Sequence, residues 1–158
     1  MRIDLREMRA YPGQPVRSEG QEVLEDLMWC DEPLPLVGAV RVVASAFYDQ
    51  QRVFLTLTVS GKSVRRCSRC VLEFEEEFER QDLLEIELDD PNASYVELRP
   101  WIAAAVRLAV SPRPLCRTDC QGLCAGCGAD LNVEEHREGC VELAPARDPR
   151  LEKLRELL

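Results

Sequence analysis

Cysteine is concentrated at two places in this sequence, and its spacing there is the feature most able to do chemistry. Residues 116–132 read CRTDCQGLCAGCGADLN and contain four of the eight cysteines. A further C-x-x-C pair, Cys67 and Cys70, lies upstream, and Cys140 lies downstream. Cysteines at such spacing could form disulfides, a redox centre, or a catalytic or structural metal site.

Reduced thiols are expected in this chain, which favours a metal over disulfides. The sequence opens MRIDLREMRA, without the apolar run of a secretory signal, and no apolar stretch is long enough to span a membrane. We therefore expect a cytoplasmic protein, in which clustered cysteines more often bind metal than pair with each other. Gly126 and Gly128 allow the tight backbone that lets the thiolates of Cys124 and Cys127 face one ion.

Eight side chains are candidate metal ligands, enough for two tetrahedral sites. The predicted ligands of the first site are Cys67, Cys70, Cys116 and Cys120. The predicted ligands of the second site are Cys124, Cys127, His136 and Cys140, a spacing close to that of zinc fingers and ribbons. The main alternative is one local site made by Cys116, Cys120, Cys124 and Cys127. The cofactor prediction is therefore one or two structural zinc ions.

No catalytic pattern accompanies these cysteines. His136-Arg137-Glu138 matches half of the zinc deaminase signature, but the P-C-x-x-C that should follow is missing. A thiol–disulfide enzyme would carry C-x-x-C between a strand and a helix, whereas these motifs are predicted in a hairpin and a loop. Closed four-ligand zinc sites are structural. We predict a non-enzymatic protein, with a thiol-based redox or zinc-switch protein as the alternative.

Charge is distributed unevenly along the chain. The net charge of −9 opposes broad binding to nucleic acid, and residues 73–90 hold ten carboxylates against one arginine. We predict that this acidic run is the solvated face of a strand. Basic residues instead flank the cysteines, and the candidate binding residues among them are Arg65, Arg66, Arg69, Arg113 and Arg117. The alternative is that these arginines only balance thiolate charge.

Period-two alternation predicts the sheet that positions the first cysteine pair. Residues 37–46 and 53–59 are rich in β-branched side chains and predict an antiparallel hairpin. A second turn or a bulge is expected at 60–62, and 71–79 and 84–88 predict a further pair of strands. The expected fold class is α+β, with an antiparallel β-meander or partial barrel.

Helices are expected in two places outside this sheet. Residues 98–110 are apolar almost all round and rich in alanine, which predicts a helix buried against the sheet. An Asp-Pro start and spaced leucines predict a C-terminal helix over 148–158, and a helical turn is expected around 21–28. We expect 1–110 to form the β domain, with an irregular N-terminal segment and the buried helix. Residues 111–158 are expected to form a zinc-binding module with the C-terminal helix, and both parts to make one compact unit.

A set of short motifs extends over about residues 37–158. They are C-S-R-C-V-L-E from Cys67, S-P-R-P-L-C ending at Cys116, D-C-Q-G-L-C-A-G-C-G-A-D-L-N from Asp119, and D-P-R-L from Asp148. Together they resemble the YceD family, the large ribosomal RNA subunit accumulation proteins. The resemblance implies a cytoplasmic, non-enzymatic protein needed for processing or accumulation of 23S ribosomal RNA in large-subunit assembly.

The same resemblance implies the partners. They are a large-subunit ribosomal RNA precursor or a large-subunit ribosomal protein, with no membrane and no small-molecule substrate. Relatives often end the cysteine module with a C-x-C pair soon after Leu-Asn, whereas this chain offers only His136 and Cys140. We expect the basic, cysteine-bearing end to contact RNA, and the acidic strands to face away or to hold a basic ribosomal protein.

Overall fold

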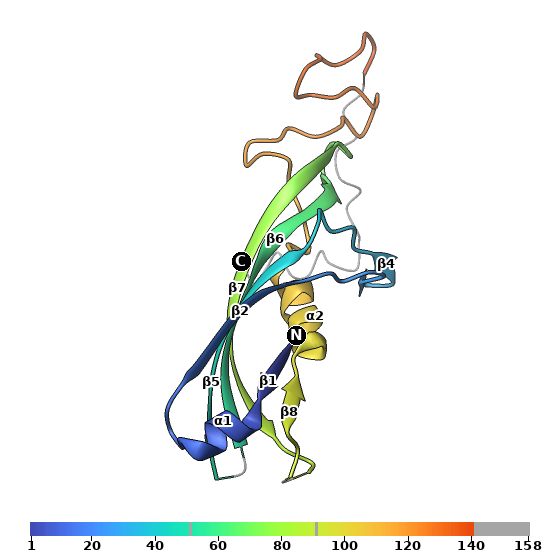
Figure 1. Ribbon diagram of the computed structural model, residues 1–158. Coiled ribbons are helices and arrows are strands. Elements are labelled where there is room, and N and C mark those ends of the chain that lie inside the picture. The colour runs from blue at the N-terminus through green and yellow to red at the C-terminus, as the bar shows by residue number, and fades with distance from the viewer. Residues whose placement is uncertain (51, 91, 141–158) are drawn as a thin grey trace, which may run out of the picture. The chain divides into compact units, whose positions relative to one another are not determined.

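The structure is a computed structural model that describes residues 1–50, 52–90 and 92–140. The chain divides into two units (Figure 1). The first unit comprises Met1–Arg66 and Glu73–Pro114, and the second comprises Cys67–Leu72 and Leu115–Leu158. The division expected at residue 110 stays a prediction, and the helix expected over 148–158 lies outside the described residues.

A four-stranded antiparallel sheet, in the order β2-β5-β6-β7, forms the larger part of the first unit (Figure 1). Its strands are β2 (Val16–Glu22), β5 (Val40–Asp49), β6 (Arg52–Arg66) and β7 (Glu73–Glu87). In β5 and β6 every second side chain is buried, from Val40 to Ala46 and from Val53 to Val59. The predicted hairpin and the meander through β7 are therefore confirmed, whereas a partial barrel stays a prediction.

The turns expected inside the third and fourth strands are wrong. β6 and β7 pair without interruption from Arg52↔Glu87 to Arg66↔Glu73. Gly61 does not turn the chain but makes room for its cross-strand neighbour, because a Cβ there would lie 2.9 Å from Cζ of Phe78. Arg80 and Asp82 share the inner face of β7 and satisfy each other at 2.9 Å, so these polar residues need no turn.

Among its described residues, the first unit also contains five short elements outside the four-stranded sheet. They are β1 (Arg2–Asp4), α1 (Leu5–Ala10), β3 (Met28–Trp29), β4 (Glu32–Pro33) and β8 (Tyr95–Glu97). β1 pairs with β8, and the Asp4 side chain caps α1 by accepting from the Arg6 amide at 2.8 Å. The helical turn expected around 21–28 is wrong, because Gln21 and Glu22 are the last residues of β2 and pair with β5.

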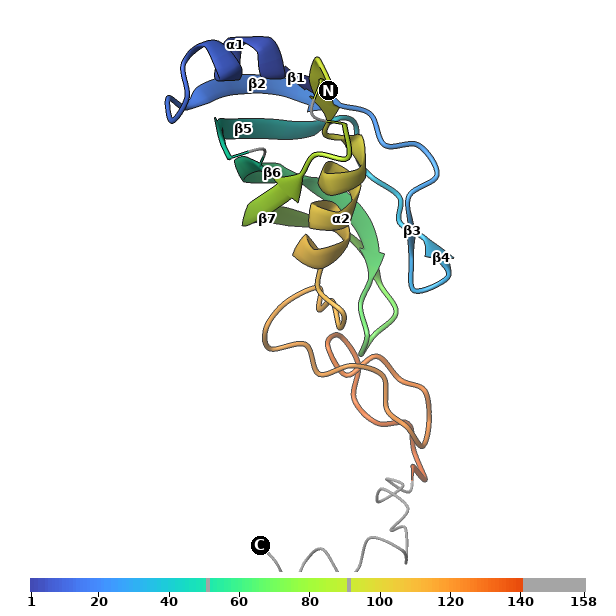
Figure 2. The same ribbon diagram turned by 90° about the horizontal axis from the view of Figure 1, so that it is seen from below.

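The helix predicted over residues 98–110 is present as α2 (Arg99–Ala109) and packs against β6 and β7 (Figure 2). It buries Ile102, Ala105 and Val106, whereas Trp101 and Leu108 are exposed. The sheet therefore covers only one face of this helix, although its sequence is apolar on nearly every side. No helix in the described part of the chain has the length and apolar content needed to cross a bilayer.

Candidate metal centres

The first cysteine group lies wholly within the second unit. It consists of Cys67, Cys70, Cys116 and Cys120, whose sulfur atoms all lie within 4.8 Å of one another. Cys67 and Cys70 come from the segment that joins β6 to β7, and the other two follow the loop after α2. Three of the four are buried, and all four are free thiols.

The sulfur separations in this group match a tetrahedron around one ion. Sγ of Cys67 lies 3.7 Å from Sγ of Cys120, and Sγ of Cys70 lies 3.6 Å from Sγ of Cys116. Zinc–sulfur bonds of about 2.3 Å at tetrahedral angles place two sulfurs about 3.8 Å apart, whereas a disulfide needs about 2.05 Å. The donor set therefore fits a divalent, thiolate-preferring metal ion.

The second group has the same geometry with one nitrogen ligand. It consists of Cys124, Cys127, His136 and Cys140, whose ligand atoms also lie within 4.8 Å of one another. Sγ of Cys124 is 3.6 Å from Sγ of Cys140, which is 3.5 Å from Nδ1 of His136. Bonds of about 2.0–2.1 Å to nitrogen and 2.3 Å to sulfur predict a nitrogen–sulfur edge of about 3.6 Å. The alternative of one local site had joined Cys116 and Cys120 to Cys124 and Cys127. The structure places the first two in one group and the last two in the other.

The two C-x-x-C turns share one hydrogen-bond pattern. In the first, the Cys67 amide donates to the Leu72 carbonyl at 2.9 Å, and the Val71 amide donates to the Cys67 carbonyl at 3.0 Å. In the second, Cys124 makes the equivalent bonds with Ala129, at 2.8 Å, and with Gly128, at 2.9 Å. The residue after the second cysteine has positive φ in both turns, 64° at Val71 and 73° at Gly128. Only the second turn has the glycine that this conformation favours.

Polar residues around the first group hold its ligands in place. Asn132 Nδ2 lies 3.5 Å from Sγ of Cys120, while its Oδ1 accepts from the Gln121 amide at 2.8 Å and from Arg117 at 2.7 Å. The Arg69 guanidinium donates to the Cys120 carbonyl at 2.7 Å. Such outer contacts orient metal ligands and offset thiolate charge. Asn132 was not identified from the sequence, because only folding brings the Leu-Asn motif to the sulfur.

The pKa values of the cysteines diverge within each group. Burial raises the pKa of Cys67, but bonds from nearby backbone amides outweigh it and lower the pKa to about 6. Burial and the other sulfurs raise the pKa of Cys116 to about 12. In the second group, backbone amides, that of Arg137 first, lower the pKa of Cys127 to about 6, whereas a neighbouring sulfur and burial raise that of Cys140 to about 12. Each group can therefore hold a thiolate but needs a cation to hold all of its thiolates.

The remaining predicted binding residues lie in the first unit, in different surroundings. The Arg65 side chain is 9% exposed, donates to the Ser111 carbonyl at 2.9 Å and lies over the Trp29 ring. Arg66 is exposed and pairs with Glu73 at 3.0 Å. Arg113 is also exposed. Arg65 thus serves the packing of the first unit, whereas Arg66 and Arg113 face solvent.

Comparison with known proteins identifies the family of this chain. The family model described as "Large ribosomal RNA subunit accumulation protein YceD" matches residues 72–158, which is more than half of the chain. The chain belongs to the YceD family. No curated protein and no solved structure matches it. The match confirms the resemblance read from the motifs around the cysteines.

Proposed function

We propose that this YceD-family protein acts in the cytoplasm to support processing and accumulation of 23S ribosomal RNA during large-subunit assembly. Membership of the family supports this role, because the family description names accumulation of the large-subunit RNA. In this role the protein is a binding factor rather than an enzyme. Each cysteine group offers four protein ligands, which leaves a tetrahedral ion no open position for a substrate or a reactive water.

The second unit carries two structural zinc ions in this proposal. The observation that supports them is the pair of ligand groups with edges of 3.5–3.7 Å. Zinc suits a set of thiolates with one imidazole, and such sites contribute about 10–16 kcal/mol of folding free energy. The ions fix the loops that follow α2. The described residues of these loops form no helix or strand, so regular backbone hydrogen bonding does not hold them in place.

Exposed arginines of each unit are the proposed contacts with precursor RNA. They are Arg66 and Arg113 of the first unit, and Arg69 and Arg117 of the second. Arg65 is left out of this set because its guanidinium is enclosed by the first unit. The net charge of −9 repels RNA at long range. At cellular salt, however, charges more than about 8–10 Å apart are largely screened, so the cations nearest to a phosphate determine whether it binds.

Binding to large-subunit precursor particles tests this role. The variant is the triple change of Arg66, Arg69 and Arg117 to Ala, and the matched control changes Glu75, Glu77 and Glu79 to Gln. We expect the arginine variant to bind more weakly, with the slope of log affinity against log salt reduced by about one unit per lost phosphate contact. Normal binding by the arginine variant together with failure of the control would show that the particle is held through a basic protein.

The redox alternative rests on the second group. Cys127 is half-buried and its pKa is lowered to about 6, which favours reaction with oxidants. A thiol redox enzyme would reduce insulin disulfides with turnover, and a zinc switch would release its metal in mild peroxide. We expect neither, and robust turnover in the insulin assay would replace the assembly role with a redox one.

A further inference from the structure

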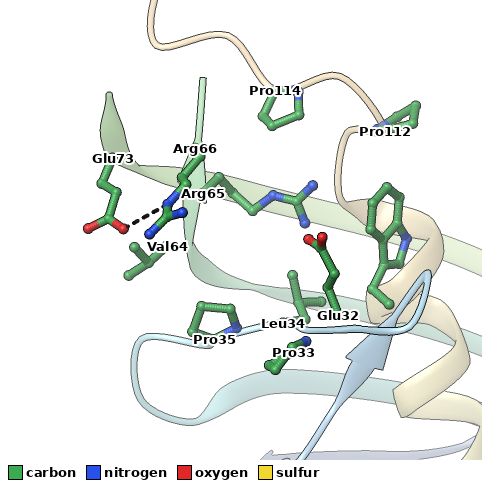
Figure 3. Close-up of a pocket in the computed structure, with 11 residues that line it drawn as sticks. Glu32, Pro33, Leu34, Pro35, Val64, Arg65, Arg66, Glu73, Pro112 and Pro114 are labelled. Atoms are coloured by element: carbon green, nitrogen blue, oxygen red, sulfur yellow. Dashed lines mark hydrogen bonds and ion pairs between the residues drawn. The ribbon is translucent and has the colours of Figure 1, made fainter. Parts of the chain in front are cut away.

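The first unit contains a cavity of about 570 Å³ that no proposed metal ligand lines. Four prolines, Pro33, Pro35, Pro112 and Pro114, line it together with Trp29 and the end of β6. In Figure 3, Pro33 and Pro35 lie on one side and Pro112 and Pro114 on the other. All the lining residues belong to the first unit.

Hydrogen bonds hold both walls of this cavity to the rest of the unit. The Val64 amide of β6 donates to the Pro35 carbonyl at 2.9 Å, and Arg65 donates to the Ser111 carbonyl, next to Pro112, at 2.9 Å. The indole N–H of Trp29 donates to the Arg107 carbonyl at 2.9 Å. Proline also fixes its own φ, so the walls are preformed and lose little conformational entropy when a ligand binds.

The charged side chains of the cavity are paired, with one exception. Arg66 pairs with Glu73 at 3.0 Å, and Arg65 lies 3.9 Å from a Glu76 oxygen and 4.8 Å above the Trp29 ring. Glu32 has no ion pair within the described residues. Its carboxylate points into the space between the proline walls (Figure 3). The unmet charge in the cavity is therefore negative.

A row of carboxylates begins at the rim of the cavity. Glu73 lines the cavity at the start of β7, and Glu75, Glu77 and Glu79 follow on the exposed face of the same strand. Arg66 pairs with Glu73, and Lys62 lies 2.9 Å from Glu77 and 4.0 Å from Glu75. Alternate residues of a strand are about 6.6–7 Å apart, so the row presents negative charge at a spacing that an extended chain can match.

We propose that this cavity binds an extended, basic, proline-containing peptide segment of a protein partner. Aromatic-lined grooves with rigid walls accept polyproline II segments, because these bind in a conformation that they already favour. A lysine or arginine of the ligand pairs with Glu32, and further cations lie along the carboxylates that follow Glu73.

The same observations oppose RNA as the ligand of this cavity. Carboxylates repel phosphates, and both Glu32 in the cavity and the exposed face of the neighbouring strand β7 are acidic. The inference stands apart from the proposed assembly role, since Glu32, on which its test depends, is neither a proposed metal ligand nor a proposed RNA contact. Loss of peptide binding and loss of binding to precursor particles are therefore separate results.

Fluorescence anisotropy with the full-length, metal-loaded protein tests the proposal. The probe is a labelled eight-residue peptide that alternates lysine or arginine with proline. Two matched peptides replace proline by glycine or the cations by glutamate, and an eight-nucleotide single-stranded RNA competes. We expect Glu32→Gln to weaken probe binding about threefold and Glu32→Lys about tenfold or more. The control Glu25→Gln changes an exposed charge outside the cavity and should leave binding unchanged.

Three results would overturn the proposal. The first is equal binding of the proline and glycine peptides, which would mean that charge alone is recognised. The second is unchanged probe binding in Glu32→Lys, which would place the site elsewhere. The third is binding of the RNA in preference to the basic peptide. Glu32 variants are exposed-side-chain changes, so circular dichroism of each should match the parent protein and rule out unfolding as the cause.

Discussion

Removing one sulfur from each cysteine group tests whether the second unit holds two ions. Cys67→Ser removes a ligand of the first group, and Cys124→Ser removes a ligand of the second. Cys30→Ser is the control, because Cys30 is an exposed thiol outside both groups. Serine keeps the size of the side chain, so the change acts mainly on the bond to the metal.

The expected loss follows from the closed geometry of each group. Binding of about 10–16 kcal/mol shared by four ligands gives about 2.5–4 kcal/mol for each, or two to three powers of ten in affinity. We use a competing chelator whose affinity for zinc lies between that of an intact group and that of a group lacking one ligand. Under these conditions the parent protein and the Cys30 variant retain two ions. Each of the other variants retains one, because the groups share no ligand.

Elemental analysis gives the stoichiometry, and X-ray absorption at the zinc edge identifies the ion that remains. The parent protein should average 3.5 sulfur ligands per zinc, because one group has four sulfurs and the other three. Cys67→Ser should leave three sulfurs and one nitrogen, and Cys124→Ser should leave four sulfurs. One ion in the parent protein, lost in Cys124→Ser and kept in Cys67→Ser, would refute the two-group reasoning and support the local site.

Three further changes test individual features of the second unit. Val71→Gly should raise the free energy of unfolding by about 0.5–1 kcal/mol in thermal melts, because a β-branched residue at φ 64° is strained; a lower melting temperature would contradict this. Gly122→Ala should cost about 2 kcal/mol and weaken metal retention, because φ is 81° and the new Cβ would lie 3.0 Å from Arg69 atoms. Chelation should make the seven ligand cysteines accessible to alkylation, because the ions fix the loops that carry them, and mass spectrometry should count the modified thiols; cysteines that stay protected after chelation would contradict this.

Elements with strong local signals were predictable from the sequence. Alternating β-branched residues predict the β5–β6 hairpin, and the alanine content and the Ser-Pro that follows predict α2 and its end. Elements held by distant partners were not. β2 reads VRSEGQE, which has little apolar alternation, and is recognised only through its pairing with β5. The continuity of β7 was missed for a related reason, since Arg80 and Asp82 satisfy each other within the strand.

The ligand groups were more predictable than their surroundings. Two C-x-x-C turns and a count of eight donors suggested the division that the sulfur distances support. The first group depends on cysteines more than forty residues apart, such as Cys70 and Cys116, but the chain has few other cysteines or histidines that could serve as ligands in their place. Asn132 and the buried role of Arg65 depend on tertiary hydrogen bonds, for which the sequence holds no spacing signal.

The basic residues near the cysteines illustrate why one role does not exclude another. A zinc ion with four thiolates carries a net charge of about −2, and the second group with three thiolates about −1. Two arginines offset this charge indirectly. Arg69 donates to the Cys120 carbonyl, and Arg117 donates to the side-chain oxygen of Asn132. Both side chains remain exposed at their other edges, and a guanidinium has five donors. The same arginines can therefore steady the loops that carry the cysteines and still present donors to a phosphate outside.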